Sequence, residues 1–318
     1  MTLPARRLGD QGPQVGAIGL GCMGLSWAYG KASDQATATR VVAAALEAGV
    51  TLIDTADVYG PFTNEELVGG ALAGRRDEAV LATKVGLVVR DKATFDIGRD
   101  GRPEHVREAI DASLRRLGTD RVELYQLHRV DPEVPVEETW GAMAELVAEG
   151  KVRALGLSEV SVDELERVHA IHPVTSVQSE LSLWTRDALD AVLPWCEAHG
   201  AAFIPFAPLG RGYLTGTVTA ASFDDDDFRA RNPRFTREAL EANLAIVERV
   251  REVAGRHGAT PAQVALAWTL AQGEAVVPIP GTTKPERVAE NAGAAGLSLT
   301  AEDLADLDDA PAAVGARY

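Results

Sequence analysis

The segment VLATKVGLVVRDKATFDIGRDGRPEHVREAIDASLRRLGTDRVELYQLH, residues 80–128, decides the fold. It begins and ends with short apolar runs, VLATK (80–84) and LYQLH (124–128). Runs that are apolar continuously rather than alternately are typical of parallel strands buried on both faces. Between them, a helical pattern opens at Pro103 and stops at Gly118, with its apolar residues along one side. The segment therefore predicts a strand, a helix and a second, parallel strand.

The same alternation of strands and helices covers most of the chain. Eight strands alternating with helices favour a closed (β/α)8 TIM barrel over a doubly wound sheet. We expect residues 1–318 to form a single domain of this kind. The six further strand candidates are AIGLG (17–21), TLIDT (51–55), ALGLS (154–158), SVQSE (176–180), AFIPFA (202–207) and VVPIP (276–280).

Helix boundaries carry their own sequence signals. Asp34 is expected to cap the start of one helix, and Gly49 to end it. In a capping box, a hydroxyl side chain and a Glu or Gln three residues later each accept a backbone N–H of the first helical turn. Such boxes are predicted at Ser161 with Glu164, at Thr260 with Gln263, and at Thr283 with Glu286.

Two segments exceed a minimal barrel. Residues 1–16 predict an N-terminal β-hairpin, with its turn at Gly12-Pro13, that plugs the bottom of the barrel. Residues 208–275 form a long segment on the C-terminal face that is Gly-rich at first, has an acidic run at Asp224–Asp227 and contains two predicted helices. A long ordered loop of this kind is usually a lid. Because no regular ligand spacing accompanies the acidic run, a solvated surface is favoured there over a metal site.

Composition and charge narrow the function. The 318 residues carry 31 Lys and Arg against 47 Asp and Glu, a net charge of −16 that disfavours nucleic acid and anionic membranes as partners. No run of about 18 apolar residues and no secretory signal is recognised, so we expect a cytoplasmic protein. Cys22 and Cys196 form no motif, which favours packed thiols and no metal site.

One motif suggests a different fold. Residues 19–24, GLGCMG, match the G-x-G-x-x-G fingerprint of dinucleotide-binding folds. That fingerprint requires a helix at once and an acidic residue about 20 positions further on. Here the next predicted helix begins only after Asp34, and the next predicted strand ends only at Asp54. The barrel interpretation is therefore retained.

Polar residues cluster at the predicted strand ends. In a (β/α)8 barrel, the chemistry lies at the C-terminal ends of the strands. Each polar residue alone has an ordinary structural explanation, such as a salt bridge, a buried histidine or a capped turn. Together they are hard to attribute to packing, because burying unpaired polar groups costs free energy. The residues are Asp54, Lys84, His128, Ser158 and Gln178, with Tyr59 in the loop after Asp54.

Four of these residues form a coherent proton-donating site. A tyrosine has an ordinary pKa of about 10, and a neighbouring ammonium favours its ionised form. Lys84 supplies that cation, and Asp54 holds Lys84 charged and oriented. His128 can donate a hydrogen bond to an oxygen on which negative charge develops. With Tyr59 as general acid, the set suits the reduction of a carbonyl group.

A basic helix start follows the eighth strand. Lys284 and Arg287 lie where a helix N-terminus already favours anions. Two readings stay open, a phosphate site or a pair of exposed first-turn cations. Barrels frequently bind phosphate after strands seven and eight, which supports the first reading.

The chain resembles the aldo-keto reductases, most closely the bacterial and fungal branches with a GCMG-type first loop. This resemblance implies a (β/α)8 barrel, an NADPH-dependent carbonyl reductase, and a tetrad of Asp54, Tyr59, Lys84 and His128. The motifs that carry the resemblance, in the family's order, are IGLGCMGLSWAYG, LIDTADVYG, NEELVG, LATK, LYQLH, GLSE, VQSELSLW, PLGRGYLTG and VPIPGTTKPERVAEN.

The resemblance also implies the residues that bind NADPH or NADP⁺. Ser158 and Gln178 match positions that bind the nicotinamide carboxamide, whereas Glu159 stands where many members have Asn. Phe206 replaces the family's common Tyr, and its ring can stack on the nicotinamide equally well. Trp27, Tyr29 and Trp184 are assigned to the substrate pocket, with lid packing as the alternative. The remaining cofactor residues are Gly21, Met23, Leu209, Gly210, Arg211, Gly281, Thr283, Lys284, Arg287, Glu290 and Asn291.

The sequence thus predicts an NADP-dependent oxidoreductase that reduces aldehydes or ketones to alcohols by hydride transfer. One alternative is an NADPH-binding sensor with little turnover. Another is a barrel lyase or isomerase that exchanges no hydride. The expected partner is a small carbonyl compound. The sequence names neither that compound nor the state of any homo-oligomer.

Overall fold

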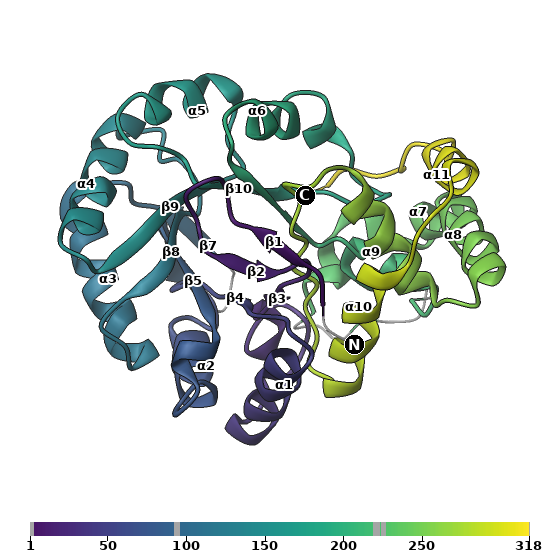
Figure 1. The fold of residues 1–318 in the computed structure, drawn as a ribbon, viewed down its shortest axis with the longest axis horizontal. Helices are drawn as coiled ribbons and strands as arrows, with labels where there is room; N and C mark the ends of the chain where they lie inside the picture. The colour runs from purple at the N-terminus through teal and green to yellow at the C-terminus, as the bar shows by residue number, and fades with distance from the viewer. Residues whose placement is uncertain (1–2, 92–95, 219–222, 224–226, 318) are drawn as a thin grey trace.

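The computed structural model describes residues 3–91, 96–218, 223 and 227–317. Seven parallel strands form one curved sheet in the order β11-β10-β9-β8-β5-β4-β3 (Figure 1). Each overlaps one of the first seven predicted strands, and neighbours in sequence are neighbours in space. The bounds are β3 (Leu20–Gly21), β4 (Leu52–Asp54), β5 (Val80–Val85), β8 (Val122–Leu127), β9 (Val152–Ser158), β10 (Ser176–Glu180) and β11 (Ala202–Phe206).

The eighth predicted strand, residues 276–280, closes the barrel without forming a regular strand. On one side, the Val277 N–H donates to β11 at 2.8 Å. On the other, the carbonyls of Pro278 and Pro280 accept N–H bonds from residues 19 and 21 at 2.9 and 3.3 Å. A proline has no N–H, so the two prolines leave the ladder incomplete. The (β/α)8 architecture is confirmed, with one irregular member.

Helices surround the sheet and alternate with its strands (Figure 1). Asp34 caps α1 by accepting the Thr37 N–H at 2.8 Å, and Gly118 ends α3 in the left-handed conformation. The bounds are α1 (Gln35–Glu47), α2 (Thr63–Ala71), α3 (Pro103–Leu117), α4 (Val136–Ala148), α5 (Val162–His169), α6 (Val192–Ala198), α7 (Arg237–Ala242), α8 (Leu244–His257), α9 (Pro261–Ala271), α10 (Pro285–Gly293) and α11 (Ala301–Asp308).

Two of the three predicted capping boxes are confirmed, at Ser161 and Thr260. The third, at Thr283 with Glu286, is wrong. Helix α10 has Lys284 as its N-cap, and no side-chain cap bond forms there. Pro285 explains the difference, because a proline is favoured at the first helical position and so moves the start by one residue.

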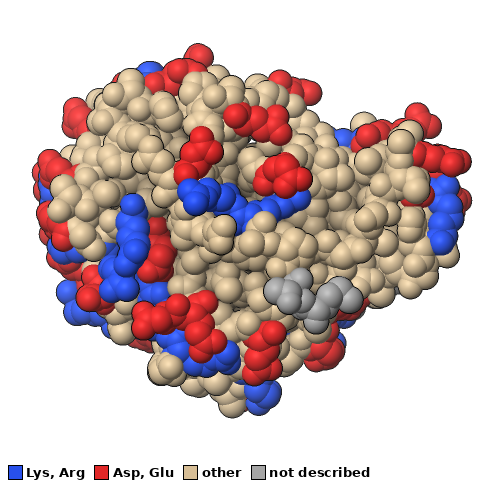
Figure 2. Space-filling view, viewed as in Figure 1, with Lys and Arg blue, Asp and Glu red and all other residues tan. Residues whose placement is uncertain are grey.

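The N-terminal hairpin is present. Strands β1 (Ala5–Arg7) and β2 (Gln14–Gly16) pair antiparallel. Leu8 and Val15 are buried in one cluster with barrel-interior residues such as Leu52, Leu124 and Ile204. The hairpin therefore plugs the N-terminal end of the barrel, as predicted. It crosses the face toward the viewer in Figure 1, and charges of both signs lie on that face in Figure 2.

Two further features belong to the C-terminal face of the barrel, opposite the hairpin. An unpredicted antiparallel ribbon, β6 (Leu87–Asp91) and β7 (Asp96–Arg99), follows β5 directly. The long segment between β11 and α9 contains short 3₁₀ helices, followed by the α-helices α7 and α8. Of the acidic run, residues 224–226 lie outside the described residues. Asp227 is buried and pairs with Arg229 at 2.6 Å, so a solvated surface was wrong for this residue.

The described part of the chain lacks two features. None of its helices combines the length and the hydropathy of a membrane span. Within the same residues, His, Cys, Asp and Glu form no group of three or more that could hold a metal ion.

Asp303 attaches helix α11 to the end of α8. Its carboxylate accepts the Thr300 N–H at 2.9 Å and meets His257 Nε2 at 2.7 Å and Arg256 at 3.1 Å. Burial alone would raise the pKa of Asp303, but the bonds from His257 and Thr300 lower it to about 2. A pKa lowered on folding stabilises the protein above the unfolded value of about 3.9. This stability is lost as the pH falls toward 2.

We therefore expect Asp303→Asn to lower the free energy of unfolding by about 1–2 kcal/mol at pH 7, because it weakens a helix cap and an ion pair. The difference from wild type should shrink between about pH 4 and pH 2, the interval between the two pKa values. Urea unfolding at several pH values measures it. Asp306→Asn, which removes a more exposed partner of Arg256, is the control and should cost less. An Asp303→Asn effect that is constant with pH contradicts the assignment.

Candidate active site

The four residues of the predicted tetrad lie together at the mouth of the barrel. Asp54 is the last residue of β4, Lys84 lies near the end of β5, and His128 directly follows β8. Tyr59 lies in the loop after β4. All four are buried, and Lys84 is completely inaccessible. Because the strands are parallel, their C-terminal ends meet at one edge of the sheet and bring these side chains together.

Lys84 is the centre of the group. Its ammonium forms an ion pair with Asp54, donates to the Thr55 carbonyl at 2.8 Å, and lies 3.4 Å from the Tyr59 hydroxyl. Burial alone would lower the pKa of Lys84, but Asp54 and Tyr59 raise it above its usual value. The ammonium therefore stays charged at neutral pH.

Tyr59 is held protonated. Burial raises the pKa of its phenol, and Lys84 acts in the opposite direction. From the sequence, Lys84 was expected to lower the pKa of Tyr59, and Lys84 acts in that direction. Burial has the larger effect, so the pKa is raised overall. The phenol therefore keeps its proton at neutral pH, next to a cation that can stabilise the phenolate left after proton donation.

His128 is neutral and has an unused nitrogen. Its ring meets the Tyr59 ring edge-on, with centroids 5.7 Å apart. Burial, followed by the charges of Lys84 and Arg129, lowers the pKa of His128 well below its usual value. Its Nδ1 is buried without a hydrogen-bond partner among the described residues. A neutral imidazole has one N–H to donate, so a ligand oxygen in this mouth could receive a hydrogen bond.

Two glutamines orient Asp54 from below. Its second carboxylate oxygen accepts bonds from Gln126 Nε2 at 3.0 Å and Gln178 Nε2 at 2.9 Å. From the sequence, Gln178 was expected to be a cofactor ligand, and in the structure its amide also donates a hydrogen bond to Asp54. Gln126 was missed. It precedes His128 by two residues on β8, so strand alternation places both on the same face and could have identified it.

The other strand-end candidates form a second group beside the tetrad. Ser158 accepts a bond from Arg129 at 2.9 Å. Glu159 has a positive φ of 56° and accepts the Glu180 N–H at 3.0 Å. Phe206 ends β11 and is partly exposed. The three residues therefore surround the part of the mouth that lies over β9, β10 and β11.

The candidates for the rest of a dinucleotide lie on both sides of the closing segment. Leu209, Gly210 and Arg211 are at the start of the segment between β11 and α9, where Arg211 binds Glu180 at 3.1 Å. Gly21 approaches the closing segment so tightly that a Cβ there would lie 2.8 Å from the Ile279 carbonyl. The remaining candidates, Gly281, Thr283, Lys284, Arg287, Glu290 and Asn291, lie just before or within α10.

The start of α10 carries two exposed cations, with the acidic Glu286 between them. Lys284 and Arg287 are exposed, and neither forms an ion pair with another residue of the described ranges. No side chain caps the first turn. Unpaired cations at an uncapped helix N-terminus suit a phosphate group. With the unused His128 nitrogen at the mouth, the residues present fit a phosphorylated dinucleotide.

The aromatic candidates are divided between two places. Trp27 lies beside Tyr59, with ring centroids 6.1 Å apart, and Met23 joins the same cluster. Tyr29 lies farther out, with the Arg229 guanidinium 5.3 Å from its ring. Trp184 is buried and stacks on Tyr213 at 4.5 Å, as lid packing would require. Leu87, Val89 and Ile97 of the unpredicted ribbon also pack against the Tyr59 cluster.

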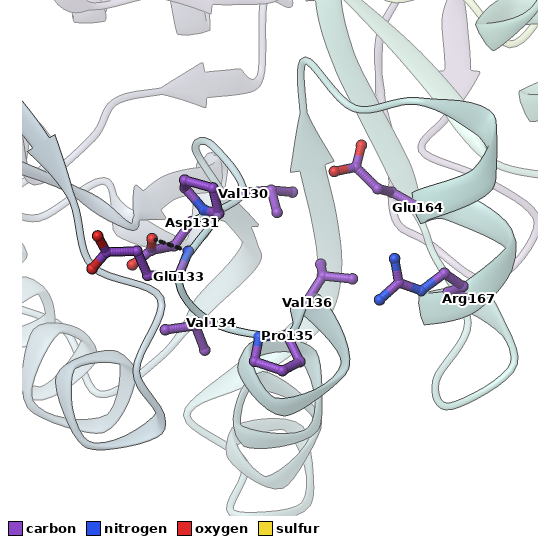
Figure 3. A pocket seen from close by; sticks show the side chains of 9 residues that line it. Val130, Asp131, Glu133, Val134, Pro135, Val136, Glu164 and Arg167 are labelled. Atoms are coloured by element: carbon purple, nitrogen blue, oxygen red, sulfur yellow. Dashed lines mark hydrogen bonds between the residues drawn. The ribbon is translucent and has the colours of Figure 1, made fainter.

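A separate hollow of about 440 Å³ lies away from this mouth (Figure 3). It is formed by residues 130–136, which follow β8, together with Glu164 and Arg167 of α5. Two of its charged groups are already engaged, since Glu164 belongs to a capping box and Arg167 pairs with Glu137 at 2.6 Å. None of the predicted site residues lines it.

The arrangement of these residues agrees with the comparisons to known proteins. The family model described as "Aldo/keto reductase family" matches residues 17–311. The chain belongs to the aldo/keto reductase family. A protein named probable aldo-keto reductase 1 from Glycine max is 45% identical over 305 residues, which cover 96% of this chain and 88% of that protein.

Solved structures of family members have the same fold. The glycerol dehydrogenase from Gluconobacter oxydans is 33% identical and superimposes with a TM-score of 0.88, covering 96% of this chain and 94% of that one. An aldo-keto reductase from Klebsiella pneumoniae, solved in complex with NADPH, is 30% identical with a TM-score of 0.74, covering 97% and 95%. The family and fold expected from the sequence are thus confirmed.

The buried ion pair leads to a stability prediction. Lys84→Met leaves Asp54 charged and buried without its main partner, and we expect a loss of about 3–5 kcal/mol in the free energy of unfolding. Combining Lys84→Met with Asp54→Asn removes both charges, so the double variant should be less destabilised than Lys84→Met alone. Urea unfolding of the wild type and the variants measures this. If the two losses simply add, the pair does not interact as the structure indicates.

Proposed function

We propose that this protein reduces aldehydes or ketones to alcohols, with Tyr59 as the proton donor. The observation that carries the proposal is the position of the Tyr59 hydroxyl, 3.4 Å from the buried Lys84 ammonium and beside a neutral His128. Proton donors, cations and hydrogen-bond donors directed at one point suit an oxygen that gains negative charge and then a proton.

We infer that the cofactor is NADP(H). Support comes from the NADPH complex of the related Klebsiella pneumoniae reductase and from the cations that precede α10. When bound, NADPH supplies the hydride for the carbonyl carbon. Lys284 and Arg287 would hold the 2′-phosphate, Arg211 the pyrophosphate, and Phe206 the nicotinamide face. Ser158 and Gln178 would bind the carboxamide group.

Each member of the tetrad then has a distinct role. Tyr59 gives its proton to the substrate oxygen. Lys84 stabilises the resulting phenolate, and Asp54 keeps the ammonium charged and in place. His128 donates a hydrogen bond to the same substrate oxygen, which orients the carbonyl before proton transfer. Trp27 and the β6–β7 ribbon beside Tyr59 limit the space for the substrate.

Tyr59→Phe tests the assignment of the proton donor. The variant keeps the ring and its packing but loses the hydroxyl, so kcat for aldehyde reduction should fall about 10²–10⁴-fold, the usual contribution of a general acid. NADPH affinity, followed by fluorescence titration, should stay within a factor of about two, because the hydroxyl is not assigned to the cofactor. Wild-type turnover across a panel of aldehydes and ketones supplies the reference. Full activity of Tyr59→Phe refutes the mechanism, and an inactive wild type that binds NADPH favours a sensor.

Lys284→Ala combined with Arg287→Ala tests the cofactor assignment. Losing two charged contacts to the 2′-phosphate should weaken NADPH relative to NADH by about 10²-fold. NADH affinity itself should hardly change, because NADH lacks that phosphate. Lys151→Ala, which removes a lysine paired with Asp111 far from α10, is the charge-matched control for one of the two substitutions. An unchanged preference for NADPH over NADH means that the phosphate lies elsewhere.

A further inference from the structure

The C-terminal tail, residues 310–317, returns from α11 to the barrel (Figure 1). Two buried asparagines of the segment between β11 and α9 hold its backbone. Asn243 exchanges two bonds with Val314, at 2.7 and 3.0 Å, and Asn232 donates to the Arg317 carbonyl at 2.9 Å. These side-chain bonds replace a regular helix or strand, so they give the tail a defined path.

At its end the tail reaches the barrel mouth at the ends of β9, β10 and β11. The Arg317 guanidinium forms ion pairs with Glu159, just after β9, and with Glu180 at the end of β10, the latter at 2.9 Å. The Glu180 side chain is 2% exposed and also binds Arg211. The contact therefore joins the tail to the C-terminal ends of the neighbouring strands β9 and β10, and through Glu180 to Arg211 of the segment after β11.

This contact lies in the space assigned to the cofactor. The Arg317 guanidinium is 5.9 Å from the centre of the Phe206 ring, on which the nicotinamide is proposed to stack. Glu159, which Arg317 binds, follows Ser158, and Arg211 shares Glu180 with Arg317. Arg317 of the tail thus contacts Glu159, Glu180 and Phe206, which lie around the proposed nicotinamide and pyrophosphate positions.

We propose that the tail is a strap over the proposed nicotinamide and pyrophosphate positions, with Arg317 as its fastening residue. NADP(H) enters or leaves after Arg317 has released Glu159 and Glu180. The proposal rests on the cofactor assignment of the proposed function. It also gives the Glu159 carboxylate a role, because that carboxylate holds the Arg317 guanidinium.

A closed strap has a kinetic consequence. Release of Arg317 breaks its ion pairs with Glu159 and Glu180, although Glu180 keeps Arg211 at 3.1 Å and Arg234 at 4.0 Å. The loss of two partly buried pairs keeps the open state a minority. If the cofactor binds the open state, its apparent affinity is reduced by the open fraction. At high NADPH concentration, the observed rate of binding should then reach a plateau set by the opening rate.

Stopped-flow binding of NADPH to the purified protein, followed by cofactor fluorescence, tests the strap without catalysis. For the wild type we expect an observed rate that saturates with NADPH concentration. For Arg317→Ala the observed rate should rise linearly with NADPH concentration. At the concentration where the wild type reaches its plateau, the variant's rate should be about tenfold higher, the factor that corresponds to losing two partly buried ion pairs. Deletion of residues 310–318 should have the same effect, and Arg317→Lys an intermediate one. Arg40→Ala, an exposed arginine of α1, is the control and should behave as wild type.

Three results overturn the proposal, and they are distinguishable. Linear kinetics with equal slopes in the wild type and Arg317→Ala mean that no strap limits entry. Weaker NADPH binding by Arg317→Ala, with faster dissociation, means that Arg317 is a cofactor ligand instead. If neither protein binds NADPH, the cofactor assignment itself fails, and the strap fails with it.

Discussion

The buried ion pair of Lys84 with Asp54 is the constraint on which the barrel mouth depends. An ammonium without access to solvent is costly unless it is paired and hydrogen-bonded on all sides. Four strands supply the partners of this ion pair. The pair itself comes from β4 and β5, and β8 and β10 contribute the amides of Gln126 and Gln178 that satisfy the second oxygen of Asp54. Tyr59 is held at the same ammonium, so the polar residues of the mouth form one network rather than several independent contacts.

The parts of the site that the sequence predicted are those that strand topology fixes. In a parallel barrel, residues at successive strand ends must converge, so locating the strands was enough to bring Asp54, Lys84 and His128 together. Helix ends were equally predictable where one local signal dominates, as at Asp34 and Ser161. The resemblance to the family agreed with this local evidence over nearly the whole chain.

The sequence did not predict contacts between distant segments. Asp227 was misjudged because it bridges Tyr29 in the loop after β3, far away in sequence. The Thr283 capping box failed for a local reason, because Pro285 competed with it. The net effect on the Tyr59 pKa depends on how deeply the ring is buried, which no local pattern gives. The path of the tail depends on Asn232, Asn243 and two glutamates that lie between 71 and 158 residues away in sequence. Such contacts become visible only when the fold is known.

The prolines of the closing segment have a mechanical consequence. Around most of the barrel, neighbouring strands share a regular ladder, whereas residues 276–280 join β11 and β3 through a few backbone bonds. Pro205 on the adjacent strand lacks an N–H as well. The ring therefore has one weak joint, and local opening of the sheet is expected to begin there rather than at the densely bonded β8 and β9. Because α10 follows this joint directly, motion of the joint would shift the basic start of α10 relative to the rigid side of the barrel, where Lys84 and His128 lie.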